Sequence, residues 1–172
     1  MLLELLLKSL YFFLPAYLAN MTPNLVRKIP FLGKPIWEAK LGSHKTWRGL
    51  VAGTLMGGIV FLLQQVAYAY GFTSIALIDY TGFSPLFGFF MGFGALFGDI
   101  IKSYYKRKVQ IAPGQSWIPW DQLDFIFGGI IIGWLFYVPS IEVVVVLLIV
   151  SPFLHLAANY VGYLLHINPN RW

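Results

Sequence analysis

The sequence predicts an all-α integral membrane protein with about five transmembrane helices. Of its 172 residues, 58% are hydrophobic and only 11% are charged, whereas soluble domains carry about 25% charged residues. Several apolar segments also reach the roughly 20 residues that a helix needs to cross a bilayer. No low-complexity linker divides the chain, so we expect one membrane-embedded domain over residues 1–172.

The five segments predicted to cross the membrane are not equally apolar and continuous. The first contains Glu4 and Lys8, which stand four residues apart and can pair on one helical face, and Pro15, which predicts a kink. A helix lying on the membrane surface is the alternative reading of this segment. The other four are uninterrupted by charge over most of their length. The five segments are about 2–20, 49–70, 84–104, 121–138 and 141–165.

Glycines recur at four-residue spacing within these segments. Small residues at this spacing let membrane helices approach closely, so we expect them at helix–helix contacts. The same role fits three further glycines in the fourth span. The residues are Gly49, Gly53 and Gly57, then Gly88 and Gly92, Gly94 and Gly98, and finally Gly128, Gly129 and Gly133.

The cationic charge lies mainly in two connecting segments, about 21–48 and 105–120, whereas the segment 71–83 has no Lys or Arg. By the positive-inside rule, both basic loops are cytoplasmic, which places the N-terminus outside and the C-terminus, with Arg171, in the cytoplasm. The predicted location is the cell membrane, with several crossings. A net charge of +5 suits anionic lipid or a phosphate-rich ligand. Without a soluble module, nucleic-acid binding is not expected, and the absence of cysteine excludes thiolate catalysis.

Three carboxylates fall where hydrocarbon or its boundary is expected. Each charged side chain at mid-bilayer costs on the order of 2.5–3.5 kcal/mol, so together they need water, cations or a metal ion. Asp121 and Asp124 share one helical face, and Asp99 begins a polar stripe along the third span. The stripe continues through Lys102, Ser103, Lys106 and Arg107.

Carboxylates beside lysines and arginines suit a polyphosphate bound with Mg²⁺. The carboxylate oxygens can hold the ion, and the cationic side chains can neutralise the remaining phosphate charge. The sequence therefore predicts Asp99, Asp121 and Asp124 as metal ligands. The alternative is a buried ion-pair network that only fastens two helices.

A second polar cluster precedes the second span. Lys45, Thr46 and Arg48 stand at the start of a helix, whose N-terminal amides favour an anion. The alternative is a topology anchor at the headgroup level. Pro35 and Gly42 bracket a short interfacial helix. In the last span His155 and Asn159 share a face, which indicates either a helix–helix hydrogen bond or a place in a polar cavity.

These motifs together resemble the CDP-diacylglycerol synthase family of membrane cytidylyltransferases, and more closely its archaeal branch, the CDP-archaeol synthases. The resemblance covers most of the chain. Gln115, Ser116 and Trp117 replace the His-Gly-Gly of the bacterial type, and Gln122 stands where Arg is common. The matching residues are Gly98-Asp99, Lys102-Ser103, Lys106-Arg107, Pro113-Gly114, Asp121-Gln122, Asp124, Asn20-Met21, Pro23 and the block Lys45 to Gly49.

The resemblance implies that CMP is transferred from CTP to an isoprenoid ether-lipid phosphate, 2,3-bis-O-geranylgeranylglycerol 1-phosphate. The products are a CDP-archaeol-type lipid and pyrophosphate, in membrane phospholipid biosynthesis. It also implies Mg²⁺ as cofactor and an active site facing the cytoplasm, and it leaves a homodimer open. The implied catalytic residues are Asp99, Asp121, Asp124 and Lys106; the nucleotide and phosphate ligands are Asn20, Pro23, Lys45, Thr46, Arg48, Lys102, Ser103, Lys106 and Arg107.

Two other functions fit part of the pattern. A CDP-alcohol phosphotransferase is also membranous and aspartate-dependent, but its denser run of aspartates is missing from this sequence. A transporter or channel could use the same three aspartates as an ion pathway. Transporters often contain internal repeats, and the two halves of this sequence show no convincing repeat.

Overall fold

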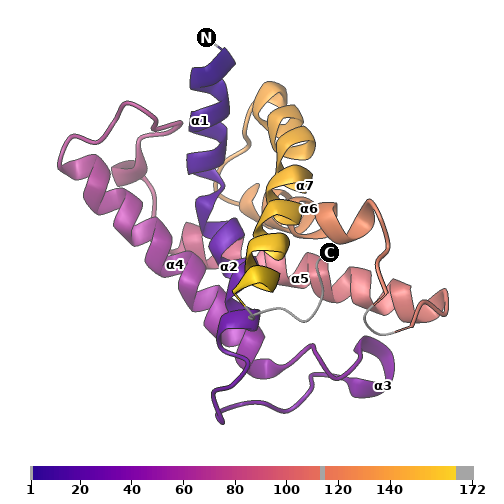
Figure 1. Ribbon diagram of the computed structural model, residues 1–172. Coiled ribbons are helices and arrows are strands. Elements are labelled where there is room, and N and C mark those ends of the chain that lie inside the picture. Colours follow the sequence, from indigo (N-terminus) through magenta and orange to yellow (C-terminus); the bar gives the residue numbers. More distant parts are fainter. Residues whose placement is uncertain (1, 113–114, 166–172) are drawn as a thin grey trace.

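The structure is a computed structural model that describes residues 2–112 and 115–165. Within these ranges the chain is helical, as the sequence predicts, and its connections are turns and loops (Figure 1). The Pro113-Gly114 motif and Arg171 lie outside the described residues. The elements are α1 (Leu2–Phe12), α2 (Leu14–Leu25), α3 (Glu38–Leu41), α4 (Trp47–Ala69), the short 3₁₀ helix η1 (Tyr80–Gly82), α5 (Leu86–Lys108), α6 (Trp120–Gly133) and α7 (Ile141–Leu164).

The first predicted span is a bent pair, α1 and α2, with an angle of 50° between them. Pro15 lies in the first turn of α2, where its ring and missing N–H prevent the bond to the Tyr11 carbonyl four residues earlier. The Gln64 side chain of α4 donates to this carbonyl instead, at 2.5 Å. Because lipid offers no replacement partner for a freed carbonyl, Gln64 makes the kink tolerable inside the bundle. Glu4 and Lys8 form the expected ion pair, at 2.7 Å.

Glycine contacts bring α4, α5 and α6 together, as their spacing predicts. A methyl group placed on Gly57 of α4 would lie 2.6 Å from the carbonyl oxygen of Gly88 and 2.8 Å from Cα of Gly92, both in α5. On the other side of α5, a methyl group on Gly98 would collide with the carbonyl oxygen of Asp124 in α6. This last approach places the backbones that carry Asp99 and Asp124 in direct contact.

The lengths of the helices differ from the expected spans at two places. α5 continues to Lys108, so that the basic loop is shorter than predicted. The expected fourth span, 121–138, is the 14-residue α6, which ends at Gly133; at 1.5 Å per residue it is about 21 Å long, less than the roughly 30 Å of a bilayer core. Within the described residues, three helices are long and apolar enough to cross, or four with the bent pair as one span.

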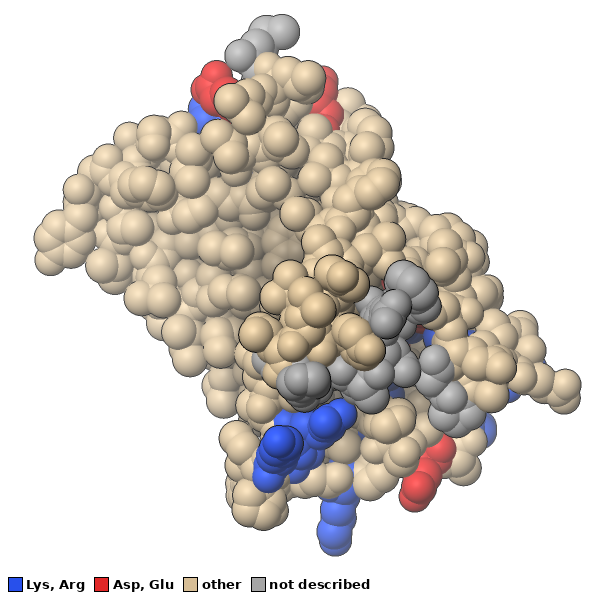
Figure 2. Space-filling model, in the orientation of Figure 1, with Lys and Arg blue, Asp and Glu red and all other residues tan. Residues whose placement is uncertain are grey.

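The two ends of the molecule differ in character. The N-terminus, η1 and the start of α7 lie at one end, and α3 lies at the other (Figure 1). Lys and Arg gather at the α3 end in Figure 2, and a broad uncharged surface separates them from the few charges at the opposite end. The buried apolar core is rich in aromatic rings, including Phe13, Phe61, Tyr80, Phe87 and Phe125. This core holds the helices rigidly on one side of the polar cluster described next.

Candidate active site

The carboxylates of Asp99, Asp121 and Asp124 surround one ammonium group, that of Lys102. The Lys102 Nζ atom lies 3.0 Å from Asp99 Oδ1, 2.8 Å from Asp121 Oδ1 and 2.9 Å from Asp124 Oδ2. Asp99 and Lys102 come from α5, and the other two come from the first turns of α6, as the sequence predicts. The close packing of Gly98 against α6 is what brings these two faces within ion-pair distance.

Two more lysines complete the cluster. Lys45, from the segment before α4, pairs with Asp99, and Lys106 lies 2.9 Å from Asp121 Oδ2. Three ammonium groups thus face three carboxylates, and the formal charge of the cluster is zero when all six are ionised. The Asp124 side chain is only 5% exposed and the Lys106 side chain 9%, so the ions depend on one another for their stability away from water.

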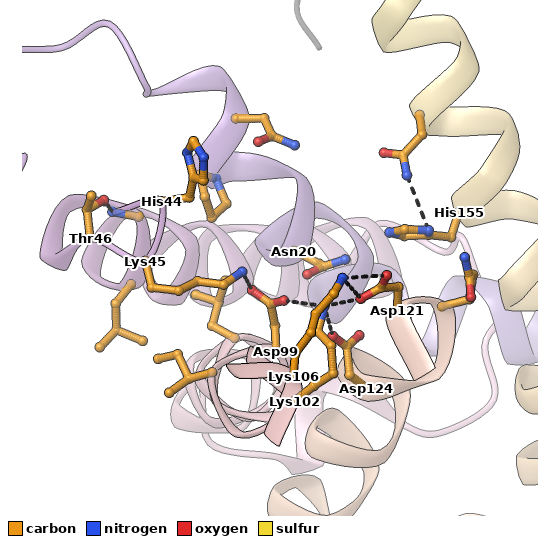
Figure 3. A pocket seen from close by; sticks show the side chains of 18 of the residues that line it. Asn20, His44, Lys45, Thr46, Asp99, Lys102, Lys106, Asp121, Asp124 and His155 are labelled. Carbon is orange, nitrogen blue, oxygen red and sulfur yellow. Dashed lines mark hydrogen bonds and ion pairs between the residues drawn. The ribbon is translucent and has the colours of Figure 1, made fainter. Parts of the chain in front are cut away.

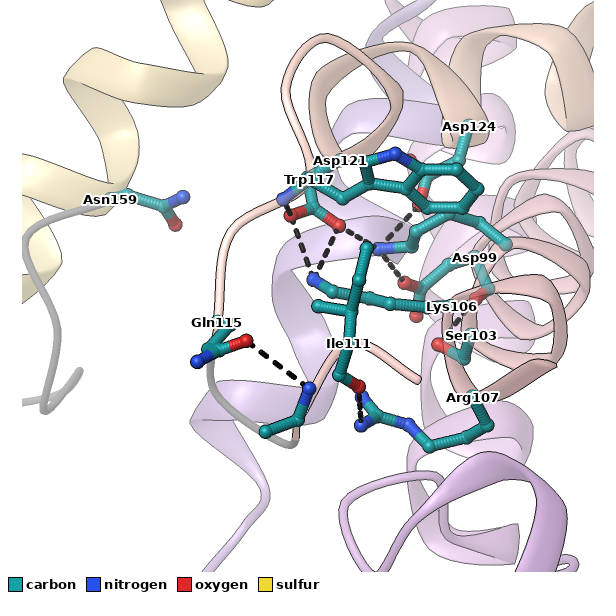
Figure 4. Close-up of polar contacts among 12 residues, drawn as sticks. Asp99, Ser103, Lys106, Arg107, Ile111, Gln115, Trp117, Asp121, Asp124 and Asn159 are labelled. Carbon is teal, nitrogen blue, oxygen red and sulfur yellow. Dashed lines mark hydrogen bonds and ion pairs between the residues drawn. The ribbon is translucent and has the colours of Figure 1, made fainter. Parts of the chain in front are cut away.

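Backbone groups hold two of the carboxylates in place. The Trp117 N–H donates to Asp121 Oδ2 at 2.6 Å, and the Phe125 N–H donates to Asp124 Oδ1 at 2.6 Å. Asp121 also lies in the first turn of α6, where the helix dipole favours a negative charge. Figure 4 shows Asp121 between Trp117 and the ammonium group of Lys106. Asp124 Oδ2 has no hydrogen-bond partner within the described residues and forms an ion pair with Lys102.

These charged groups line a cavity of about 300 Å³. Nine of the twelve sequence-predicted site residues line it, and Figure 3 shows Lys45 and Thr46 on one side of the cavity and Asp121 and Asp124 on the other. Thr46 also caps α4, because its hydroxyl accepts from the Gly49 N–H at 3.2 Å. The nine are Asn20, Pro23, Lys45, Thr46, Asp99, Lys102, Lys106, Asp121 and Asp124.

The remaining three predicted site residues are not among the cavity's lining residues. The Arg48 guanidinium donates to the carbonyl oxygens of Arg27 and Ile29, and so fixes the loop before α3. Arg107 donates to the Ile111 carbonyl (Figure 4), and the Ser103 hydroxyl donates to the Asp99 carbonyl at 2.8 Å. In this structure the three shape the backbone around the site.

Several polar lining residues were not predicted as part of the site. Asn24 follows Asn20 by one helical turn in α2, a spacing that could have indicated it. Gln122 is 4% exposed and its Oε1 atom has no hydrogen-bond partner within the described residues. Gln115 and Ser116 reach the cavity from the loop before α6, where the sequence departs from the bacterial pattern. His155 and Asn159 line the cavity from α7, as one of the two sequence readings predicts, and the hydrogen bond between them lies within that helix.

The donor set can be compared with what a divalent cation needs. Mg²⁺ prefers carboxylate oxygens, and the three carboxylates already converge on one positive centre, the Lys102 ammonium. With that ammonium between them, no group of three or more His, Cys, Asp or Glu side chains in the described chain is arranged to hold a metal ion. The residue types therefore fit Mg²⁺, provided that Lys102 moves aside.

Fold and site together define a multi-pass all-α membrane protein with a charged cavity inside its helix bundle. The family model described as CarS-like, CDP-archaeol synthase, matches residues 2–172, and the chain belongs to this family. The CDP-archaeol synthase of Thermococcus onnurineus is 35% identical and that of Methanococcus maripaludis strain C7 is 34% identical, over 94% and 99% of both chains.

A solved structure is also similar. It was described as structural insight into an intramembrane enzyme for archaeal membrane lipids biosynthesis, and it has a TM-score of 0.65 and 29% identity over 88% of this chain and 92% of its own. This match supports the helical arrangement independently of the sequence motifs. Membership of an enzyme family leaves the transporter or channel reading without support.

Proposed function

We propose that the chain transfers CMP from CTP to an isoprenoid ether-lipid phosphate, with Mg²⁺ held by Asp99, Asp121 and Asp124. The relatives are named CDP-archaeol synthases, and the cavity has the charged groups that such a reaction needs. The observation that carries the cofactor assignment is the convergence of three carboxylate oxygens on one cation, at 2.8–3.0 Å from Lys102 Nζ.

The zero net charge of the six-residue cluster suggests when its lysines can bind phosphate. While the lysines are paired with carboxylates, they offer little attraction to a triphosphate. With a divalent cation held by Asp99, Asp121 and Asp124, the ammonium groups of Lys45, Lys102 and Lys106 would lose their carboxylate partners and could bind phosphate oxygens. Binding of the metal and binding of the nucleotide are therefore coupled: each is favoured by the presence of the other.

The transfer itself needs alignment and charge screening. An oxygen of the lipid phosphate attacks the α-phosphorus of CTP, and the bond from that phosphorus to the oxygen bridging to the β-phosphate breaks, so that pyrophosphate leaves. The attacking oxygen is already ionised, and no strong general base is required. The bound metal ion would stabilise negative charge on the transferring and leaving groups. The released lysines hold the phosphates in line, which converts a bimolecular encounter into an oriented step.

The position of the lysines also supports a cytoplasmic active site. The cavity is lined in part by the segments 21–48 and 105–120, which together carry nine of the twelve Lys and Arg residues. By the positive-inside rule these segments lie in the cytoplasm, where CTP is present. A protease-protection or cysteine-labelling experiment on residues of α3 in sealed membranes tests this orientation.

The function is tested with purified protein in lipid nanodiscs, labelled CTP, Mg²⁺ and geranylgeranyl ether-lipid phosphate. We expect a labelled CDP-lipid and an equal amount of pyrophosphate, both abolished by a chelator and restored by added Mg²⁺. Absence of product across metal and lipid conditions would contradict the transferase assignment. Equal turnover with other nucleoside triphosphates would contradict the preference for CTP.

A further inference from the structure

One wall of the cavity takes no part in the mechanism above. This wall is formed by α7, which contributes His155 and Asn159. In Figure 3 the imidazole of His155 points from α7 toward the cavity, on the side of Asp121 and away from Lys45 and Thr46. The two sides of the cavity therefore differ. The side with Lys45 adjoins the basic loop before α4, and the side with His155 belongs to α7.

The His155 ring is held in a defined orientation. It stacks on Phe125, with 5.8 Å between ring centroids and 26° between planes, and Phe125 is buried directly after Asp124. The Nδ1 atom of His155 lies 3.4 Å from Nδ2 of Asn159. An amide nitrogen is a donor, so Nδ1 accepts and the neutral ring carries its proton on Nε2.

The Nε2–H group is available to a ligand. Within the described residues the only hydrogen bond of His155 is the one at Nδ1. By contrast, the ammonium groups of Lys45, Lys102 and Lys106 are each paired with a carboxylate. The imidazole of His155 is thus a fixed donor that needs no cation exchange before it can bind an anion.

The location of α7 indicates which anion the Nε2–H group of His155 binds. Its side chains Phe153, Tyr160 and Val161 are 69%, 48% and 51% exposed, which in a membrane helix means contact with lipid. A hydroxyl–hydroxyl contact between Tyr17 and Ser151 ties α7 to α2 one turn before His155. A lipid acceptor must bring its phosphate into the cavity while its tails stay in the bilayer, and CTP must arrive from water. The lipid-exposed wall is therefore the acceptor's side.

We infer that His155 binds the phosphate of the lipid acceptor through Nε2–H and that Asn159 is a positioning residue that fixes the ring. The inference rests on the proposed function, since it assigns the second substrate of that reaction. It also divides the cavity into a nucleotide half, with Lys45 and Thr46, and an acceptor half on α7.

The test compares two substitutions that differ in where they place an amide donor. His155→Gln puts its side-chain nitrogen near the Nε2 position, whereas His155→Asn puts it near Nδ1; both remove the stacked ring. We expect the KM for the lipid phosphate to rise about tenfold or more in the Asn variant, because a hydrogen bond to a charged group is lost. The Gln variant should retain much of the wild-type value, and the KM for CTP should change little in either variant.

Val145→Ala, an exposed change on the same helix ten residues before His155, is the matched control and should leave both KM values unchanged. Retention of labelled lipid phosphate by CTP-free nanodiscs gives a second measure, with the Asn variant binding more weakly than the Gln variant. Equal losses in the Gln and Asn variants, or a rise in the KM for CTP as large as that for lipid, would overturn the inference. If the wild type makes no CDP-lipid, the proposed function fails on its own, whatever the His155 variants do.

Discussion

In the first half of α5, Phe87, Gly88 and Met91 are buried among apolar and aromatic side chains, whereas in its second half the buried Lys106 and the half-buried Lys102 lie among carboxylates. The first half is held by close contact: Gly88 lies against Phe61 and Gly57, and Phe87 stacks on Phe136 at 5.4 Å. The second half is held by ion pairs that could be exchanged for other ions. One helix therefore joins a fixed region to an adaptable one.

The two halves of α5 should respond differently to substitution. Close packing tolerates no added volume, so changes in the first half should lower stability and leave the chemistry of the folded molecules intact. Asp124, Lys45 and Lys106 can each be neutralised without leaving another charge of the cluster unpaired, so changes at these residues should lower activity more than stability. A network that only fastened α5 to α6 would show the opposite pattern, with loss of stability and no specific loss of turnover.

The largest expected effect is on activity. Asp124→Asn keeps the size of the side chain but removes a negative charge, and we expect the rate of CDP-lipid formation to fall by at least about a hundredfold, as for other losses of electrostatic stabilisation at reacting groups. Lys102 keeps its ion pairs with Asp99 and Asp121, so the unfolding temperature in nanodiscs should change little. Asp79→Asn, at an exposed carboxylate outside the cavity, is the matched control. Full activity of the Asp124 variant would remove it from the site.

The next effect is on folding. Gly57→Val places a side chain where a methyl group alone would lie 2.6 Å from the Gly88 carbonyl oxygen, and we expect a loss of stability of about 3 kcal/mol or more, because backbone cannot yield as a side chain does. Gly82→Ala is the control, since nothing lies within 4 Å of a methyl group there. Thermal unfolding of the purified proteins measures both. Wild-type stability in the Val variant would contradict the close contact between α4 and α5.

A smaller loss is expected at the kink between α1 and α2. Gln64→Leu removes the donor to the Tyr11 carbonyl, which Pro15 has already deprived of its helical partner, and we expect a cost of about 1–3 kcal/mol for the unpaired buried group. Turnover per folded molecule should not change. Gln64→Glu tests the same point, because a carboxylate has no donor for that carbonyl unless it is protonated. If the Leu variant unfolds at the wild-type temperature, the carbonyl has another partner.

The smallest effect concerns pH at the opposite end of the molecule. The Thr81 hydroxyl donates to Asp79 and holds the pKa of that carboxyl below its usual 3.8. A lowered pKa in the folded state contributes stability above the unfolded pKa, and this contribution is lost as the pH falls through the folded value. Thr81→Val should therefore lower the unfolding temperature slightly at neutral pH, and the difference from wild type should shrink as the solution is acidified. A difference that grows on acidification would contradict the assignment.

Much of the site could be predicted because membrane sequences make charge conspicuous. Asp99, Asp121 and Asp124 stood out against an apolar background, and helical spacing placed Lys102 and Lys106 on the face of Asp99. Arg48 and Arg107 carried the same signal but bind backbone carbonyls in the structure, because charge in the sequence does not say whether a phosphate or the chain itself will satisfy it. His155 was ambiguous for a related reason, since a polar face shared with Asn159 indicates either a helix–helix hydrogen bond or a cavity wall.

The extent of the helices was less predictable at their polar ends. Hydropathy ended the third span near 104, but α5 continues to Lys108, because its cationic last turn favours the C-terminal end of a helix. The fourth apolar segment continues past Gly133, yet α6 ends there. Composition alone does not separate a crossing helix from a shorter one followed by an apolar turn. The kink at Pro15 was predictable, but its partner Gln64 lies far away in sequence.

The central claim is that the carboxylates around Lys102 form a cation site whose occupant is exchangeable. Binding of Mn²⁺, as a stand-in for Mg²⁺, measured by electron paramagnetic resonance in nanodiscs containing wild type, Lys102→Met and Asp121→Asn tests it most directly. We expect Lys102→Met to bind Mn²⁺ more tightly than wild type, because the competing ammonium is gone, yet to lose turnover. We expect Asp121→Asn to bind Mn²⁺ more weakly. Weaker binding or none in Lys102→Met would contradict the account and leave the cluster as a fastening between α5 and α6.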